Sequence, residues 1–435
     1  VNPGKHRIFD FLVFSNNYNA RLASSHDVRY PRIHEMLALR GLETICINQP
    51  FTYPIFKAKN MVVISDWIAP KLCYFPDSMS QYLQSYRSNT PAQKFVKHPE
   101  IAISESLERI SVVNQLMEEL NWDLFWVIYT EPDHIFHGYY SKILKGENPF
   151  LKVFREIDRT IETALRKTDM ILIVSDHGFS EYKYTVNINT ILYELGLIST
   201  TRERTTMHIS DFAADHTTNV ESVKLPLRIH KFLLDHPFLK SMVKKLYKKF
   251  TGRDITAKKP DVDIANSKAF LLSSSSYGIY VKEQSLVRFI IDELKRNESI
   301  NRVYRREEIF HGPYVHEAPH ILVEPNFDKG FIIAGTAKIA PKAISSGNVY
   351  NHHPNGILIM FGHGIPAVQL KQPVRTEDIV PTILRYMALP LPVDTDGKPL
   401  PNIDYPKKEI KHHDYSRHWR LIRQIQMKKS KLRIG

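Results

Sequence analysis

Two uninterrupted apolar runs, residues 124–129 and 171–174, constrain the fold of this chain more than any other feature. Runs of this length without polar alternation are typical of strands buried on both faces of a parallel sheet. Between them, residues 150–167 carry apolar side chains at helical spacing, with charged residues on the opposite face. A strand, a helix and a second buried strand in succession indicate a parallel sheet with helices packed against it.

The same alternation of helix and strand patterns extends over most of the chain. Apolar residues at helical spacing predict helices over residues 31–40, 104–120 and 376–389. Short β-rich runs predict strands over residues 44–48, 61–65, 269–272, 278–281, 331–333 and 357–361. We therefore expect an α/β fold: a doubly wound, mostly parallel sheet with helices on both faces, and an inserted cap segment.

A change of composition sets the predicted domain boundaries. From about residue 200 the sequence becomes polar and then basic, and Phe238, Met242, Leu246 and Phe250 recur at every fourth position. This stripe is either a face that packs on the core or a face that lies on a membrane surface. We predict a catalytic α/β core in two parts, a partly helical and basic cap inserted between them, and a basic C-terminal tail. Their bounds are 1–199 and 266–400 for the core, 200–265 for the cap and 401–435 for the tail.

Positive charge is concentrated at the C-terminal end. The formal net charge is +13, and residues 407–435 hold ten Lys or Arg against only Glu409 and Asp414, so that this tail supplies +8. Such a run is either a solvated end or a contact for anionic lipid or nucleic acid. We expect no specific nucleic-acid partner, and contact of the tail and cap with anionic surfaces stays open.

The cysteines and the first residues bear on compartment and completeness. Cys46 and Cys73 lie in apolar surroundings and are interpreted as core thiols, so no disulfide framework is implied. No apolar run is long enough to span a membrane, and no signal segment precedes the fold, which together favour the cytoplasm. Val1 is not a methionine, and residues 1–6 are typical of a turn inside a domain. We therefore expect further residues upstream.

Side chains suited to metal binding stand next to the predicted strands in three places. Asp133 and His137 come shortly after the strand over residues 124–129. Because they are four residues apart, one helical turn directs both toward a common ion. Open α/β sheets place their functional sites at such strand ends.

The other two places lie later in the chain. Asp176 and His177 directly follow the strand over residues 171–174, and Gly178 lets the backbone leave sharply. His352 stands just before the strand over residues 357–361. Oxygen and nitrogen ligands without thiolates fit zinc, manganese or iron, and carboxylates also admit magnesium. Two such ions would clamp the attacking and leaving oxygens of a phosphoryl transfer.

Taken together, these motifs resemble those of the type I phosphodiesterase / nucleotide pyrophosphatase family, within the alkaline phosphatase superfamily. Asp133 with His137, then Asp176-His177-Gly178, then His352 followed by Gly356-Ile357-Leu358, match the family's metal-binding motifs in order. Residues 1–6 resemble the turn after the family's nucleophile helix, and residues 377–384 and 394–397 resemble its closing helix and loop. The resemblance runs from Val1 to about Leu400, interrupted by the cap.

The resemblance implies two divalent ions, Zn²⁺ in the first place, with Mn²⁺ or Mg²⁺ as alternatives. Asp133, His137 and His352 would hold one ion, and Asp176 and His177 would supply half of the ligands of the other. The resemblance also implies that the two ions lie about 4 Å apart. His353 could replace His352, although the spacing of His352 to Gly356 matches the family better.

The family completes the second site with an aspartate and with a Ser or Thr nucleophile that precede the turn at Val1. We therefore expect the nucleophile to lie upstream of this chain. Nucleotide-cleaving members also carry an asparagine that touches phosphate, and Phe11 occupies the matching position here. This departure argues against a nucleotide substrate in particular.

The function implied by the resemblance is metal-dependent hydrolysis of phosphoric esters, either phosphodiesters or pyrophosphates, through a Ser/Thr phospho-enzyme. Two alternatives stay open. One is another activity of the superfamily, of the sulfatase or cofactor-independent phosphoglycerate mutase type. The other is a metal-binding remnant without catalysis.

The remaining histidines carry weaker expectations. His208, Asp211, Asp215 and His216 form a loose cluster in the cap. We interpret His311, His316 and His320 as surface residues or as residues that support the site from outside. His412, His413 and His418 belong to the basic tail.

Overall fold

A small parallel sheet forms the centre of the fold. The computed structural model describes residues 1–201, 223–225, 255–257, 261–273, 275–335 and 337–432. Strand β3 (Thr44–Ile47) pairs in parallel with β4 (Met61–Ile64) on one side and with β6 (Leu124–Val127) on the other. The short β5 (Tyr74–Phe75) adds to β4 in the antiparallel sense.

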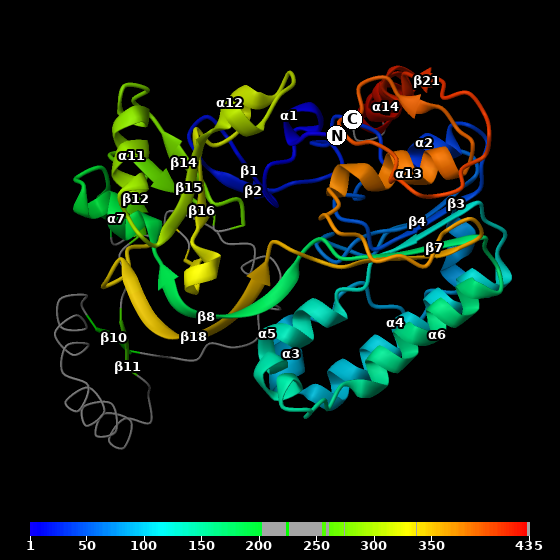
Figure 1. Ribbon diagram of the computed structural model, residues 1–435, viewed down its shortest axis with the longest axis horizontal. Helices are drawn as coiled ribbons and strands as arrows, with labels where there is room; N and C mark the ends of the chain where they lie inside the picture. The colour runs from blue at the N-terminus through cyan, green and yellow to red at the C-terminus, as the bar shows by residue number, and fades with distance from the viewer. Residues whose placement is uncertain (202–222, 226–254, 258–260, 274, 336, 433–435) are drawn as a thin grey trace.

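Helices cover both faces of this sheet, as the sequence predicted. Ile45 and Ile47 of β3 pack with α4 (Pro99–Glu119) on one face. Between them, Cys46 points to the other face, where α2 (Ile33–Ala38) lies. Figure 1 shows α2 and α13 (Ile379–Tyr386) above the strands, and α4 and α6 (Leu151–Leu165) below them. Alternate side chains of one strand therefore serve two helical layers.

Strand β7 (Met170–Val174) pairs antiparallel with β19 (Leu358–Gly362). Both strands share a hydrophobic core with β6, α2 and α13. This shared core places β7 and β19 in the same layer as β6. The prediction that β6 and β7 are buried on both faces was wrong in part. β6 is half-buried throughout, and Val174 at the end of β7 is 41% exposed. Among the strands of the described residues, β6 pairs only with β3, and β7 only with β19. Solvent reaches side chains beside these unpaired edges.

A second, antiparallel sheet packs apart from the first. Its strand order is β13 (Ala269–Leu271), β14 (Gly278–Val281), β16 (Ile321–Pro325) and β15 (Ile300–Arg305). Helices α7 (Ile188–Glu194) and α11 (Leu286–Lys295) bury their apolar faces in the core that this sheet forms.

Two long strands connect the second sheet with the central one. β8 (Gly178–Val186) pairs antiparallel with β18 (Ile344–His353) and parallel with β17 (Phe331–Ile333). In Figure 1, β8 and β18 run together from the second sheet toward α5 (Glu131–Leu144). This pair of strands brings the second and third predicted metal-binding motifs close to the first predicted motif, which lies on α5.

The predicted helices and strands are present, with boundaries that shift by up to five residues. Pro381 is the third residue of α13, where its missing N–H has no intrahelical partner to lose. The remaining elements are α1 (Pro3–His6), β1 (Leu12–Phe14), β2 (Ala20–Leu22), η1 (Asp77–Gln81), α3 (Ala92–Lys97), β9 (Ser199–Thr201), β10 (Val223–Leu225), β11 (Ile255–Ala257), β12 (Asp261–Asp263), α12 (Arg306–Ile309), η2 (Val315–Glu317), η3 (Phe327–Lys329), η4 (Thr376–Asp378), β20 (Leu391–Pro392), β21 (His412–His413) and α14 (Tyr415–Leu432).

Three further predictions from the sequence concern the cap, the cysteines and membrane-spanning helices. Most of the predicted cap, including the stripe from Phe238 to Phe250, lies outside the described residues. Cys46 is buried and Cys73 half-buried, and both are free thiols. A search of the described residues finds no helix with the length and apolarity that a membrane crossing requires.

Candidate metal centre

Helix α5 directly follows β6 and carries the first residues of the site. Pro132 occupies its first turn, where proline suits the helical backbone. Glu131, His134 and Ile135 are buried on the side that faces α3 and α4. Asp133 follows Glu131 by two residues, which rotates it about 200° around the helix axis. The opposite face of α5 therefore carries Asp133, and His137 one turn later.

Buried polar contacts fix the first turn of α5. The guanidinium of Arg109, on α4, donates through Nε to Oε1 of Glu131 at 2.9 Å, and Nη2 donates to the same oxygen. Both side chains are almost fully buried. Nη1 of Arg109 donates to the backbone oxygen of Arg87 at 2.9 Å. Nδ1 of His134 lies 2.9 Å from the backbone oxygen of Thr90.

Strands β8 and β18 bring the other ligands to α5. His352 lies opposite Phe179 in their antiparallel register. Tyr182 donates its hydroxyl to the backbone oxygen of His352 at 2.8 Å. Tyr140 of α5 donates its hydroxyl to the backbone oxygen of Phe179 at 2.9 Å, which ties the helix to β8. These bonds hold the backbones of all three elements against one another.

Gly178 has a different role from the predicted one. It begins β8 and does not have a positive φ angle, so the backbone does not use it for a sharp exit. A Cβ at this position would lie 2.1 Å from the backbone oxygen of Asn355. Glycine is therefore required because the chain after β18 passes so closely, and this approach keeps His177 near His352.

One carboxylate oxygen, Oδ1 of Asp133, is the centre of the cluster. It lies 3.0 Å from Nε2 of His352 and 3.4 Å from Nε2 of His137. The two imidazole nitrogens are 3.0 Å apart. These three atoms form a nearly equilateral triangle. Ligand atoms about 2.05 Å from a tetrahedral zinc ion are separated by about 3.3 Å, so the triangle has the size of one face of such a site.

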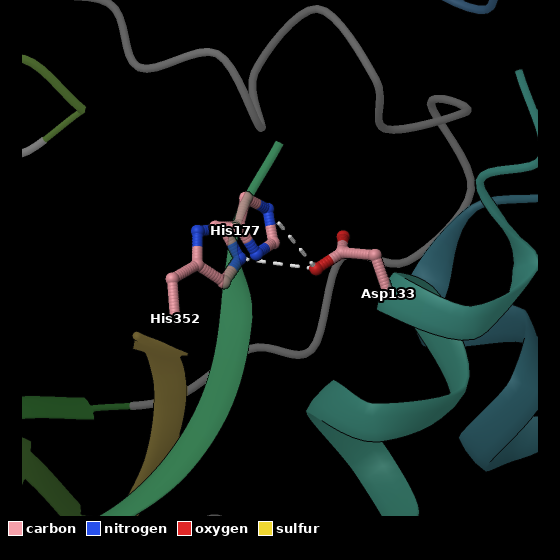
Figure 2. A group of neighbouring side chains, drawn as sticks. All are labelled: Asp133, His177 and His352. Atoms are coloured by element: carbon pink, nitrogen blue, oxygen red, sulfur yellow. Dashed lines mark ion pairs between the residues drawn. The ribbon is translucent and has the colours of Figure 1, made fainter. Parts of the chain in front are cut away.

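His177 joins the same cluster. Its Nε2 lies 3.9 Å from Oδ1 of Asp133, and its ring stacks on that of His352 with centroids 3.7 Å apart. Figure 2 shows Asp133 reaching from α5 toward the two stacked rings. Asp133, His177 and His352 place one ligand atom each within 4.8 Å of one another. The triangle with His137 is tighter, and both triads share Asp133 and His352.

Asp176 is placed differently from the other candidates. Its side chain is 88% exposed, and its carboxylate lies 3.7 Å from His177. The structure therefore brings Asp133, His137, His177 and His352 together, and leaves Asp176 at the rim.

The charge state of the cluster suits a cation. Oδ1 of Asp133 is buried and makes no well-aligned hydrogen bond, although imidazole nitrogens surround it. Burial raises the pKa of Asp133, but the contact with His352 and the neighbouring imidazoles outweigh it, so the net pKa lies below the ordinary value. Burial lowers the pKa of His137, which favours the neutral imidazole that binds metals. A buried carboxylate oxygen beside imidazole nitrogens fits a divalent ion.

The remaining candidates lie outside this cluster. Nδ1 of His353 accepts a hydrogen bond from the backbone of Asn355. His311 pairs with Asp396, His316 is largely exposed, and Nδ1 of His320 accepts from the backbone of Val281. Phe11 packs on the rings of Phe51 and Trp67. His208, Asp211, Asp215 and His216 lie outside the described residues.

Arg109 and Glu131 were missed by the sequence reasoning. Arg109 lies at helical spacing from four apolar residues, Ala102, Val112, Val113 and Leu116. A charged residue at a core position needs a partner. That signal could have identified it, but the identity of the partner depends on the fold.

Comparison with known proteins gives a match to one family. The sequence model of the family described as "Type I phosphodiesterase / nucleotide pyrophosphatase" matches residues 1–248. This range includes Asp133, His137, Asp176 and His177, whereas His352 lies beyond it. A search of the curated proteins finds no significant match.

Solved structures with a similar arrangement are distant in sequence. Phosphonoacetate hydrolase from Sinorhizobium meliloti 1021, in complex with phosphonoformate, is 13% identical, with a TM-score of 0.44 over 82% of this chain and 75% of that chain. Murine ectonucleotide pyrophosphatase / phosphodiesterase 5 is 10% identical, with a TM-score of 0.41 over 84% of this chain and 74% of that chain.

Proposed function

This chain belongs to the type I phosphodiesterase / nucleotide pyrophosphatase family, and from that premise we propose that it is a metal-dependent hydrolase of phosphoric esters. The substrates we propose are phosphodiesters or pyrophosphates. The observation that carries the proposal is the buried Oδ1 of Asp133, which faces Nε2 of His137 and of His352 within 3.4 Å.

Asp133, His137 and His352 would hold one divalent ion, for which we propose zinc. Asp176 and His177 would contribute to a second ion beside it, in accordance with the family resemblance. Bound ions of this kind polarise phosphoryl oxygens and stabilise the charge that develops on the leaving oxygen. We also propose a Ser or Thr phospho-enzyme, again from the family resemblance.

The residues around the ligands orient them. Tyr182 holds the backbone of His352, and Tyr140 holds β8 against α5. Arg109 fixes Glu131, two residues before Asp133. Exposure is between a quarter and about two fifths for the side chains of Asp133, His137, His177 and His352, and 88% for that of Asp176. A phosphate group could therefore approach the ligands from solvent.

The test is hydrolysis of bis-p-nitrophenyl phosphate by the chelator-treated full-length protein, including any residues that precede Val1, with and without added zinc or manganese. We expect turnover only with metal, and a loss of at least about 100-fold in Asp133→Asn and His352→Ala, since each removes a ligand. His316→Ala, a change at an exposed histidine, is the matched control.

Different outcomes would favour the alternatives. Faster turnover of p-nitrophenyl sulfate than of phosphate esters would favour a sulfatase. Tight zinc binding without turnover of any substrate would favour a non-catalytic metal-binding protein. Metal-independent turnover that survives both ligand substitutions would contradict the proposal.

A further inference from the structure

The C-terminal helix α14 is anchored to the fold along one side only. Trp419 is 1% exposed and donates through Nε1 to Oε2 of Glu35, at 3.0 Å. Arg423 is 7% exposed, and its guanidinium lies 4.6 Å from the centroid of the Trp419 ring. The backbone N–H of Lys57 donates to Oε1 of Gln426 at 3.2 Å. These contacts fix the orientation of the helix, so its opposite side is held toward solvent.

That opposite side combines aliphatic and cationic side chains. Leu421 is 57% exposed and Ile425 is 47% exposed, and they are neighbours because four residues make about one helical turn. Arg417, Arg420 and Lys428 are exposed around them. We refer to these five residues as the α14 face. Since the sequence has neither Asp nor Glu from residue 415 to residue 435, the charge of this helix is uncompensated within it.

The segment before α14 adds side chains of the same two kinds. Val393 is 58% exposed and Ile410 is 49% exposed. They flank the β20–β21 pair, in which the backbone N–H of Val393 donates to the backbone oxygen of His413. Lys408 and Lys411 are exposed beside Ile410. Figure 1 shows β21 and α14 together at the rim of the molecule, on the other side of the central sheet from α5.

We propose that the α14 face binds the surface of an anionic lipid bilayer. Leu421 and Ile425 would enter the interface between headgroups and acyl chains, with the helix axis parallel to the membrane plane. Arg417, Arg420 and Lys428 would contact lipid phosphates, which attract basic side chains at the surface. The candidate metal centre, on the other side of the sheet, would remain open to solvent.

The aliphatic residues favour a bilayer over nucleic acid. A nucleic-acid strand would pair with the cations, but its backbone offers no apolar surface to bury two aliphatic side chains. Interfaces that read single strands use aromatic rings, and the α14 face has none. If the helix were only solvated, Leu421 and Ile425 would both stay in water. The anchoring on Trp419, however, holds these two side chains together on one exposed side. Of these three surroundings, an anionic membrane matches both the charge and the apolar surface.

The experiment measures co-sedimentation of the full chain with vesicles. One set contains phosphatidylcholine alone, and the other contains equal amounts of phosphatidylcholine and phosphatidylglycerol. We expect binding to the anionic set only, weakened by salt. Leu421→Gln/Ile425→Gln and, separately, Arg417→Gln/Arg420→Gln/Lys428→Gln should each weaken binding about tenfold or more.

The control replaces two aliphatic residues that are as exposed but lie elsewhere. Leu144 is 63% exposed and Leu165 is 60% exposed, and Leu144→Gln/Leu165→Gln should bind vesicles as the wild type does. All variants change exposed side chains, and unchanged thermal unfolding will verify that they fold.

Three results would overturn the proposal: no binding of the wild type to anionic vesicles, equal binding to neutral vesicles, or unchanged binding by Leu421→Gln/Ile425→Gln. The last result, together with equal affinity for a DNA duplex, would show general attraction to polyanions.

Discussion

The ion pair between Arg109 and Glu131 should contribute both to the stability of the fold and to the alignment of the metal ligands. Substitutions that break the pair can measure these two contributions separately. The perturbation is Arg109→Leu, Glu131→Leu and the double substitution. The exposed fraction of the side chain is 3% for Arg109 and 0% for Glu131. Oε2 of Glu131 already has no hydrogen-bond partner among the described residues, so loss of Arg109 would leave the whole carboxylate unsatisfied.

The magnitude follows from this burial. Removing one partner of a buried ion pair costs about 3–5 kcal/mol, because the other charge is left without compensation. For a protein of this size, each kcal/mol lowers the melting temperature by about 1 °C, so each single substitution should lower it by about 3–5 °C. The double substitution replaces the pair with apolar side chains and should recover to within about 1 kcal/mol of the wild type.

Zinc affinity should respond differently from stability. Glu131 and Asp133 share the first turn of α5, and without the ion pair this turn keeps the contact of His134 with Thr90 but loses its anchor on α4. We expect the recovered double variant to bind zinc about 10–100-fold more weakly, the usual effect of losing a group that supports metal ligands.

The assay is calorimetric titration with zinc, beside thermal unfolding of the metal-free protein. Leu116→Ala is the matched control, because Leu116 is fully buried on the same helix but packs in a core cluster without α5 residues. It should destabilise by about 2–5 kcal/mol and leave zinc affinity unchanged. Wild-type zinc affinity in the double variant would refute the positioning role. A single substitution with wild-type stability would refute the argument from buried charge.

Three further predictions concern the metal, a close contact and pH. After dialysis, metal analysis should find about one tightly held zinc per chain, and His352→Ala should remove it; two tightly held ions or none in the wild type would contradict the ligand assignment. Gly178→Ala should cost about 1–3 kcal/mol in urea unfolding and weaken zinc binding, since its Cβ would lie 2.1 Å from the Asn355 oxygen. Burial lowers the pKa of His34 to about 4. The unfolded chain therefore takes up a proton first as pH falls from about 6.5 to 4, and stability should fall by up to about 3 kcal/mol over that window. His34→Gln should flatten this fall, and an unchanged pH profile would refute it.

Local patterns in the sequence predicted elements whose apolar side chains have a clear helical or strand spacing, and missed others such as α11 and β18. The helix over residues 150–167 and the strand over residues 278–281 follow from the spacing of apolar side chains, which depends only on neighbouring residues. The proximity of Asp133 and His137 also follows from the sequence, because a helix fixes the geometry of residues four apart. The strand partners could not be predicted in the same way, and β7 pairs with β19 from a distant part of the chain.

What the sequence determined by itself was the chemical type of the site and its local half on α5. The tertiary structure alone decided that His352, 215 residues beyond His137, closes the triangle, and that Arg109 is the partner of Glu131. It also decided that Gly178 is needed for a close approach of backbone and not for a turn. The physical reason is common to all three. Local periodicity reports the geometry of one element, whereas contacts between elements depend on how the sheets and helices pack together.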